Sequence, residues 1–180
     1  MILFDESDIA RTLARLAHEI LESNHGGDHL ALMGIVTRGR YLAERLAAQI
    51  GAIEGKAIPC GYLDITLYRD DVGRQFRPVG ESEAPCDLSG MRVILVDDVL
   101  HSGRTVRAAL DALSAYGRPA SVQLAVLLDR GERQLPIAPD FVGKVAPAAQ
   151  GERVVVRLRE TDGCEQVSVE QHAASRSVGA

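Results

Sequence analysis

The sequence has few cysteines, few aromatic residues and no long apolar run, and each shortage excludes a class of protein. The three cysteines, Cys60, Cys86 and Cys164, are widely spaced and form no CxxC pair, so we expect no disulfide framework and no zinc site. The longest apolar stretches, such as residues 30–36, are far too short to cross a bilayer, and no basic region of a signal peptide precedes them. We therefore expect a protein of the reducing cytoplasm that has no membrane contact.

Charge and aromatic content also limit the partners. The formal net charge is -5, so wholesale electrostatic binding to nucleic acid is not expected, and any RNA contact needs a local basic patch. Aromatic residues make up only 4% of the chain and tryptophan is absent, which argues against stacking platforms for single-stranded bases. What is present is 180 residues, 46% hydrophobic and 25% charged, which is typical of one globular domain with its own core.

Helical periodicity and short apolar runs alternate along the chain. The expected helices run from Asp5 or Ser7 to about Glu22, from just after Thr37-Arg38-Gly39 to Ile50, and over 104–116; the expected strands cover 30–36, 58–67, 91–96, 121–128, 153–158 and 166–169. This alternation predicts an α/β fold with a mostly parallel, twisted sheet and helices on both faces.

We predict a single domain over residues 1–170 that contains a polar, turn-rich segment at 68–90 and is followed by a loose tail at 171–180. A segment of that kind inside a compact domain is usually a functional lid or a disordered excursion. In parallel sheets, ligands bind outside the carboxyl ends of the strands. Three expected strand ends carry polar residues: Thr37-Arg38-Gly39, Asp97-Asp98 and Asp129-Arg130-Gly131. We therefore expect the chemistry at that edge of the sheet.

The strongest signal is a strand–loop–helix segment over residues 93–105. It reads Val93-Ile94-Leu95-Val96-Asp97-Asp98-Val99-Leu100-His101-Ser102-Gly103-Arg104-Thr105. Four apolar residues predict a buried strand with two carboxylates at its end, and the short loop opens directly into a helix. A helix N-terminus offers unpaired N–H groups to a phosphate, Gly103 lets the backbone approach, and Ser102 and Thr105 add hydroxyl donors.

Two adjacent carboxylates can accept hydrogen bonds from vicinal hydroxyls or support a magnesium ion. Together with the phosphate-binding loop, Asp97 and Asp98 therefore predict a ribose 5-phosphate site. The competing interpretation is a buried strand with an acidic end followed by an ordinary capped helix. Repulsion between the two carboxylates disfavours that interpretation.

Residues 93–105 resemble the phosphoribosyl-pyrophosphate (PRPP) binding motif of type I phosphoribosyltransferases. Together with the segments 34–39, 64–71 and 128–136, the motif resembles the family of bifunctional pyrimidine operon attenuators and uracil phosphoribosyltransferases, over about residues 2–159. The resemblance implies a phosphoribosyltransferase fold with a flexible flap and a small hood. It also implies the reaction of uracil with PRPP to give UMP and pyrophosphate, with Mg2+ carried by the pyrophosphate group.

The resemblance further implies roles for individual residues. The expected catalytic residues are Asp97, Asp98 and Arg38; the pyrophosphate-binding residues are Thr37, Arg38, Gly39 and Arg69; and the base-binding residues are Asp129, Arg130 and Gly131. Asp97 and Asp98 would hold the ribose hydroxyls, and residues 102–105 the 5-phosphate. Residues 68–83 correspond to the flap, from which Arg74 or Arg77 is an alternative to Arg69 at the pyrophosphate.

Several of these residues have a plainer interpretation. Without the resemblance, Arg38 reads as a solvated arginine after a strand, and residues 129–131 read equally well as an ordinary turn. His101 lies where some relatives carry an acid/base residue and where this family often carries an aromatic one. We interpret it as a loop residue or a contact to the edge of the substrate.

The family's second function is binding of a stem-loop in pyrimidine operon mRNA, which tightens with UMP or UTP. On the first expected helix, Arg11, Arg15 and His18 lie together opposite the apolar stripe, and Lys144 and Arg153 would extend a basic patch. An ordinary solvated face predicts much the same residues. The enzyme and the regulator are compatible functions, and we expect both.

Two alternatives remain open from the sequence. One is an RNA-binding attenuator with weak or no enzyme activity, and the other is a phosphoribosyltransferase for a different nucleobase. A homo-oligomer, a dimer or larger, is implied by the resemblance alone.

Overall fold

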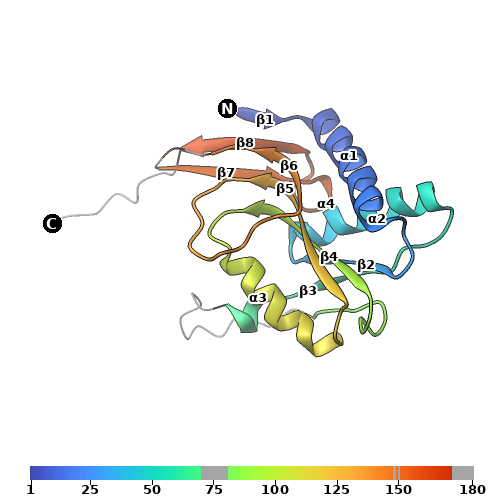
Figure 1. Cartoon of the computed structure of the whole chain (residues 1–180). Helices are drawn as coiled ribbons and strands as arrows, with labels where there is room; N and C mark the ends of the chain where they lie inside the picture. The colour runs from blue at the N-terminus through green and yellow to red at the C-terminus, as the bar shows by residue number, and fades with distance from the viewer. Residues whose placement is uncertain (70–80, 148, 150, 172–180) are drawn as a thin grey trace.

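The computed structural model describes residues 1–69, 81–147, 149 and 151–171. These residues form a five-stranded parallel sheet and a three-stranded antiparallel sheet (Figure 1). In spatial order, the parallel sheet contains β3 (Cys60–Leu63), β2 (Leu30–Ile35), β4 (Arg92–Leu100), β5 (Ser121–Asp129) and β6 (Phe141–Val145), and the antiparallel sheet contains β1 (Ile2–Phe4), β8 (Gln166–Gln171) and β7 (Glu152–Arg157). The predicted α/β class with a mostly parallel sheet is confirmed.

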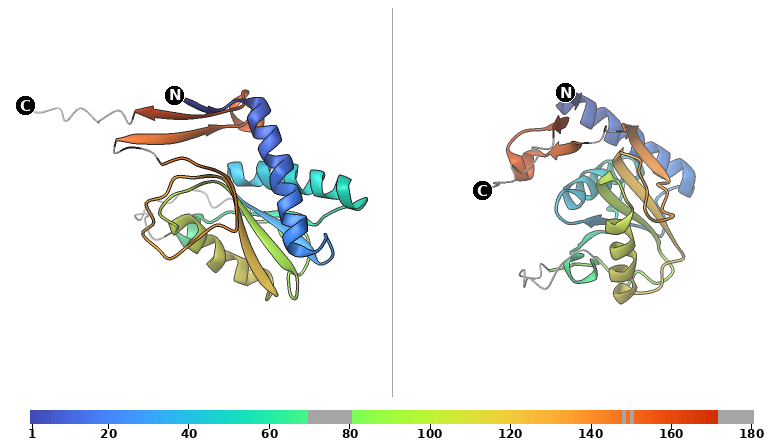
Figure 2. Two further views of the ribbon diagram at one scale, coloured as in Figure 1. Left: turned by 45° about the horizontal axis from the view of Figure 1, so that its top comes forward. Right: turned by 90° about the vertical axis from the view of Figure 1, so that its left-hand side faces the viewer.

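Helices cover both faces of the parallel sheet (Figure 2). Helices α1 (Glu6–Asn24) and α2 (Arg38–Glu54) pack together on one face, and α3 (Arg104–Leu113) packs on the other. Helix α1 begins at the expected cap, where the Asp5 carboxylate accepts the Asp8 N–H at 2.8 Å in a reciprocal capping box. Its apolar stripe is fully buried, as the helical spacing predicts.

Strand β2 explains why its sequence is continuously apolar. Leu30 and Leu32 pack with α1 and α2, whereas Ala31, Met33 and Ile35 pack with α3 on the opposite face. Because successive strand residues alternate between faces and both faces are covered by helices, every position of β2 is buried.

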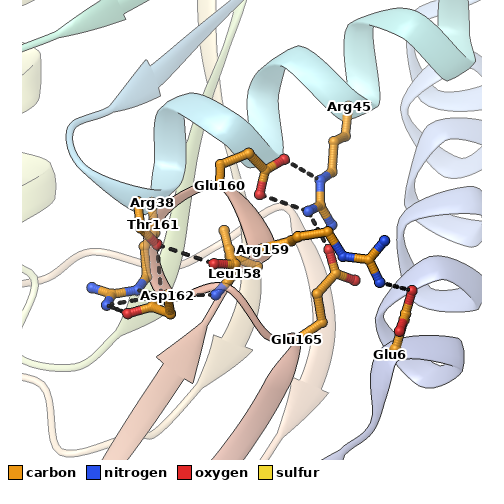
Figure 3. A network of polar contacts seen from close by, with 9 residues as sticks. All are labelled: Glu6, Arg38, Arg45, Leu158, Arg159, Glu160, Thr161, Asp162 and Glu165. Atoms are coloured by element: carbon orange, nitrogen blue, oxygen red, sulfur yellow. Dashed lines mark hydrogen bonds and ion pairs between the residues drawn. The ribbon is translucent and has the colours of Figure 1, made fainter.

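The antiparallel sheet and the short helix α4 (Arg159–Asp162), which we name the hood, share a core with the parallel sheet. Val156, Leu158 and Val167 of the hood belong to the same buried cluster as Ile9 and Leu13 of α1. Ion pairs also join the hood to α1 and α2 (Figure 3): Arg38–Asp162 at 2.9 Å, Arg45–Glu160 at 2.7 Å, Arg45–Glu165 and Arg159–Glu6 at 2.5 Å. A shared core is what one domain over residues 1–170 requires.

Several boundaries differ from the predictions. The strand expected over 58–67 ends at Leu63, because the Asp64 carboxylate accepts hydrogen bonds from the Thr66 N–H at 2.9 Å and its hydroxyl at 2.5 Å. This turn leads into a 3-10 helix at Thr66–Tyr68. The helix expected over 104–116 ends at Leu113 and continues as a 3-10 turn, and α2 begins at Arg38 rather than after Gly39.

The sequence pattern did not predict β1, β6 or α4. These elements have three to five residues each, which is too short for a periodicity to show. Strand β6 follows β5 through a turn-rich connection and forms the edge of the parallel sheet.

The segment 68–90, expected as a flap, is fixed at its C-terminal end. Leu88 is fully buried, and Glu83 exchanges backbone hydrogen bonds of 2.9 Å with Tyr62 of β3. Arg74 and Arg77 lie outside the described residues, as does all of the expected tail except Gln171. In the described part of the chain, no helix combines the length and the apolar character that a bilayer span requires.

Replacing Leu158 with alanine should lower the free energy of unfolding by about 2–5 kcal/mol, because the side chain is fully buried between the hood and the helices. Since the hood shares the main core, urea unfolding should remain a single transition. The matched control is Leu67→Ala, which removes a side chain that is 71% exposed and should cost no more than about 0.5 kcal/mol. A separate early transition of the hood would contradict the shared core.

Candidate functional site

The order of the strands defines where a ligand would bind. From β2 the chain moves to β3 on one side, and from β4 it moves to β5 and β6 on the other side. The crevice between the carboxyl ends of β2 and β4 is therefore the topological switch point of the sheet, where open α/β sheets bind their ligands. The loop with Thr37 follows the end of β2, and the Asp97–Asp98 pair lies on β4 just beyond the point where β4 stops pairing with β2.

Two glycines bring the loop after β2 directly against β4. A Cβ atom on Gly34 would lie 2.4 Å from the Gly39 carbonyl oxygen and 2.5 Å from Arg40 Cα. A Cβ atom on Gly39 would lie 2.4 Å from the Val96 carbonyl oxygen and 3.2 Å from Asp97 Cα. All four contacts are with backbone atoms, which cannot swing aside as a flexible side chain can, so residues 36–39 approach the acidic pair only because both positions are glycine.

Thr37 and Arg38 begin α2 at this point. Thr37 is the N-terminal cap residue and makes no side-chain capping bond, and the Val36–Thr37 peptide is cis. Arg38 lies in the first turn and pairs with Asp162 of the hood (Figure 3). The structure therefore brings Thr37, Arg38 and Gly39 to the edge of the crevice.

Asp97 and Asp98 lie within β4, and the prediction that this strand stops at Val96 is wrong. Strand β4 pairs with β2 only as far as Val96, but it continues beside β5 to the pair Leu100–Asp129. Asp97 and Asp98 therefore stand on the part of β4 that extends past β2 and lies beside β5. Asp97 is buried, with only 7% exposed, and Asp98 is half-buried.

Each carboxylate of this pair accepts a hydrogen bond from the next backbone N–H: Asp97 from Asp98 at 2.9 Å, and Asp98 from Val99 at 2.8 Å. Burial raises the pKa of Asp97 well above its usual range, and the negative charge of Asp98 raises it further, whereas the positive charge of Arg69 opposes the shift. Arg69 is thus close enough to act on the acidic pair. A buried carboxyl of raised pKa is suited to hydrogen bonding with neutral hydroxyl groups.

The N-terminus of α3 is open to an anion. Gly103 caps the helix with a φ of 90°, a conformation that favours glycine, and the Ser102 hydroxyl accepts the Arg104 N–H in a long hydrogen bond of 3.4 Å. The first N–H groups of a helix have no partner within the helix and carry its positive dipole end. Ser102 and Thr105, both half-buried, flank this end with hydroxyl groups, as the sequence predicted.

Arg133 joins the loop after β5 to the loop after β4. Its guanidinium donates to the His101 carbonyl at 3.0 Å, to the Ile137 carbonyl at 2.9 Å and to the Asp129 carboxylate at 2.7 Å. Only 23% of the Arg133 side chain is exposed. Nothing in the sequence distinguished Arg133 from the neighbouring Arg130, because its partners are set by how the two loops fold together.

Backbone hydrogen bonds hold the same two loops together. The N–H groups of Gln134 and Leu135 donate to the Ser102 carbonyl at 2.9 and 3.1 Å, and the Arg130 N–H donates to the Leu100 carbonyl at 2.9 Å. The expected phosphate-binding loop and the expected base-binding loop are therefore one hydrogen-bonded unit.

The three residues expected to bind the nucleobase lie on this hydrogen-bonded unit. Both oxygens of Asp129 are engaged, one by the Gly131 N–H at 2.9 Å and one by Arg133. The hydrogen bond from Arg133 is the main cause that lowers the pKa of Asp129. Arg130 is mostly buried, and its Nε has no hydrogen-bond partner within the described residues. The His101 imidazole contacts the Glu132 carboxylate at 3.1 Å, which is a further link between the two loops.

The residues expected to bind RNA fall on two surfaces. Arg15 of α1 donates to the Gly143 carbonyl of β6 at 2.6 Å, which brings it beside Lys144. Arg11 and His18 are exposed on the same helix, whereas Arg153 lies on β7 of the hood and pairs with Glu170 at 3.7 Å. Arg11 and Arg15 also pair with acidic neighbours on α1, at 2.6 Å in both cases. The basic patch is therefore locally neutralised.

A family model described as a phosphoribosyl transferase domain matches residues 2–158 of the chain. Among curated proteins, the "Bifunctional protein PyrR" of Deinococcus deserti is 57% identical over 164 residues, covering 90% of both chains. The protein of the same name from Bacillus cereus strain AH820 is 53% identical, covering 93% of this chain and 96% of that protein.

Among solved structures, a hypoxanthine phosphoribosyl transferase of Trypanosoma cruzi superposes with a TM-score of 0.72 at 19% identity, covering 94% of this chain and 90% of that chain. A hypoxanthine phosphoribosyltransferase of Staphylococcus aureus superposes with a TM-score of 0.65 at 20% identity, covering 93% of this chain and 90% of that chain. At this identity the two structures bear out the fold alone.

Replacing Arg133 with methionine should lower the free energy of unfolding by about 1.5–3 kcal/mol, because it leaves the Asp129 carboxylate and two carbonyls without a charged donor. Because folding lowers the pKa of Asp129, its interaction with Arg133 stabilises the protein fully at pH values above the pKa that Asp129 has in the unfolded chain. This stabilisation is lost as the pH falls through the lower pKa that Asp129 has in the folded protein. Urea titrations should therefore show the difference between the two proteins narrowing below about pH 4, by the part that Asp129 contributes.

The control for this prediction is Arg11→Met, which breaks a pair on the surface of α1 whose arginine is 72% exposed. It should cost less than about 1 kcal/mol. Equal losses in the two variants would mean that Arg133 is no more than a surface arginine.

Proposed function

The chain belongs to the phosphoribosyl transferase domain family and, within it, to the bifunctional PyrR proteins, and from this premise we propose that it transfers the phosphoribosyl group of PRPP to uracil and regulates pyrimidine operon transcription by binding mRNA. The observation that carries the enzymatic half is the acidic pair of β4 beside the glycine-capped N-terminus of α3, at the switch point of the sheet. That combination supplies acceptors for two hydroxyls and donors for a phosphate, a short distance apart along the chain.

In this proposal, PRPP lies along the crevice between β2 and β4. The 5-phosphate meets the N–H groups and hydroxyls of residues 102–105, and the ribose hydroxyls meet Asp97 and Asp98. The carboxyl of Asp97 is fixed by burial and by its bond to the Asp98 N–H, so it is ordered before the sugar arrives. The residues expected at the pyrophosphate, Arg38 and Arg69, provide the positive charge.

Breaking the bond from the anomeric carbon to pyrophosphate creates positive character on the sugar and negative charge on the leaving group. The chain contributes by orienting both reactants, by excluding water and by stabilising the departing anion with Arg38 and the backbone at Gly39. Uracil loses its proton late in such a reaction, so no strong protein base is required. His101 contacts Glu132, and we assign it the role of a loop residue or of a contact to the edge of the substrate.

We propose that Mg2+ enters bound to PRPP, whose diphosphate oxygens are the hard ligands that this ion prefers. The half-buried Asp98 fits such a complex, because it uses one oxygen for the Val99 N–H and carries a second that can face a ribose hydroxyl or a water of the ion. When bound, the ion neutralises charge that develops on the pyrophosphate.

The base is assigned to the loop of Asp129, Arg130 and Gly131, and uracil is favoured over a purine by the PyrR relatives. The structural neighbours act on hypoxanthine by name, so a purine is the alternative substrate that an assay must include. The mostly buried Arg130, whose Nε faces no partner in the described residues, is a donor that a base carbonyl could engage.

The regulatory half of the proposal uses the surface of α1 and β6. Arg11, Arg15, His18 and Lys144 offer contacts to RNA phosphates, and Arg153 adds one from the hood. Acidic neighbours offset much of this charge, so recognition would rest on the shape of a stem-loop and on few phosphates. UMP or UTP in the proposed PRPP site would strengthen this binding. We also propose a homo-oligomer and, because the cysteines are free, a place in the reducing cytoplasm.

Asp98→Asn should lower kcat/KM for UMP formation from PRPP and uracil by roughly 100-fold, because the amide cannot replace a charged acceptor for a ribose hydroxyl. The thermal midpoint should change little, since Asp98 is half-buried and the amide oxygen of asparagine can still accept the Val99 N–H. Turnover is measured with radiolabelled uracil, PRPP and Mg2+, and in parallel with hypoxanthine.

The matched control is Asp111→Asn, which removes an exposed carboxylate on α3 that pairs loosely with Arg107 at 3.5 Å. It should leave turnover unchanged. A large loss of stability in Asp98→Asn would indicate a purely structural carboxylate. Turnover of hypoxanthine but not uracil would identify the protein as a phosphoribosyltransferase for a different nucleobase. No turnover by the unmodified protein would support an RNA-binding attenuator without enzyme activity.

Arg15→Ala should weaken binding to a pyrimidine operon leader transcript in the presence of UMP, and should reduce the slope of log affinity against log salt by about one unit. One phosphate contact is lost, and the effect should not depend on the sequence of the RNA loop. Filter retention over a series of salt concentrations gives both quantities.

Arg107→Ala on α3, a surface arginine on the opposite side of the parallel sheet, is the control and should leave the slope unchanged. UMP formation by Arg15→Ala should equal that of the unmodified protein. An unchanged salt slope in Arg15→Ala would count against this face of the molecule.

A further inference from the structure

Arg38 and Asp162 form a two-pronged ion pair although they are 124 residues apart in the chain (Figure 3). Arg38 Nη2 donates to Asp162 Oδ1 at 2.9 Å, and Nε donates to Oδ2 at 3.3 Å. The two side chains are 32% and 22% exposed, so the pair lies at the seam between α2 and the hood rather than in open solvent. Geometry of this kind is more specific than that of an ordinary surface pair.

Asp162 is held in place without help from Arg38. Its Oδ2 accepts the Leu158 N–H at 2.9 Å and the Thr161 hydroxyl at 2.6 Å. The Thr161 hydroxyl and the Leu158 N–H, followed by Arg38, lower the pKa of Asp162 to about 2. The carboxylate therefore remains charged and oriented at any pH at which the protein would be assayed.

The pair uses only one edge of the Arg38 guanidinium. Nε and Nη2 face Asp162, whereas Nη1 has no hydrogen-bond partner among residues 1–69, 81–147, 149 and 151–171. Arg38 stands in the first turn of α2, beside Gly39, whose Cα hydrogens face the Val96 carbonyl of β4. A guanidinium fixed by one edge at this place can present its other edge to an anion in the crevice.

We propose that Asp162 is a positioning residue for the transfer reaction, which holds Arg38 by one edge so that the other edge meets the departing pyrophosphate. The inference rests on the proposed function, in which Arg38 binds that anion. A long arginine side chain otherwise loses rotamer freedom when it binds a ligand, and here the loss has already occurred during folding. The hood thereby orients Arg38, a residue of α2 at the edge of the crevice.

The opposite effect would be competition, in which Asp162 occupies Arg38 and pyrophosphate must displace it. Two observations favour positioning. Asp162 engages a single edge of the guanidinium, and two other donors satisfy its Oδ2, so neither partner has to leave for an anion to bind.

The test is a double-mutant cycle between Arg38→Ala and Asp162→Asn, read as kcat/KM for PRPP with Mg2+ at saturating uracil. In the unmodified background, Asp162→Asn should lower kcat/KM by about 10-fold or more, because a misoriented group acts poorly on a leaving anion. In the Arg38→Ala background, the same substitution should change it by less than about twofold. KM for uracil should be unchanged in both.

Glu160→Gln is the matched control, because Glu160 lies on α4 beside Asp162 and ties the hood to Arg45 at 2.7 Å without touching Arg38. It loosens the same seam and should alter kcat/KM for PRPP by less than about twofold. Urea unfolding of all variants separates a loss of stability from a loss of orientation.

Three results would overturn the proposal: equal losses with and without Arg38, a comparable loss in Glu160→Gln, or an increase in kcat/KM in Asp162→Asn, which competition predicts. Failure of the proposed function looks different. If Arg38→Ala alone has no effect on turnover, Arg38 does not act on the pyrophosphate, and if the unmodified protein makes no UMP, the enzyme assignment itself fails.

Discussion

The close approach of the loop after β2 to the end of β4 is the constraint on which the site depends. Gly34 and Gly39 permit backbone contacts that any side chain would block, at distances as short as 2.4 Å for an added Cβ. The extension of β4 beyond β2 then brings Asp97 and Asp98 to the edge of the crevice. Without these two features, the N-terminus of α3 and the acidic pair would exist in the molecule but would have no loop opposite them.

Arginines fixed by carboxylates organise the rest of the edge. Arg133 holds Asp129 and two carbonyls, and so joins the loops after β4 and β5 into one unit. Asp162 pairs with Arg38 and so joins the first turn of α2 to the hood. Guanidinium groups suit this work because their donors lie in a rigid fork and remain charged when partly buried. These two ion pairs therefore order the loops at the carboxyl edge of the parallel sheet.

Much of this organisation was predictable from the sequence. The apolar run of β2, the capped stripe of α1 and the strand–loop–helix segment over 93–105 are local patterns, in which neighbours along the chain determine what forms. The order of helices and strands predicted the parallel sheet, and the rule for ligand binding at its carboxyl edge located the crevice. The resemblance of short motifs then indicated the family.

Other features depend on contacts between residues far apart in the chain, and only the tertiary structure decided them. Strand β4 continues past Val96 because β5 lies beside it, so Asp97 and Asp98 belong to the strand rather than to the loop after it. The His101 carbonyl that accepts from Arg133 and the Asp162 carboxylate that accepts from Arg38 come from other loops, and nothing near either arginine in the sequence indicates them. The sequence by itself determined which elements form and which chemistry they carry, because those depend on local propensity and residue type. Burial, side-chain orientation and ion pairing were decided by packing.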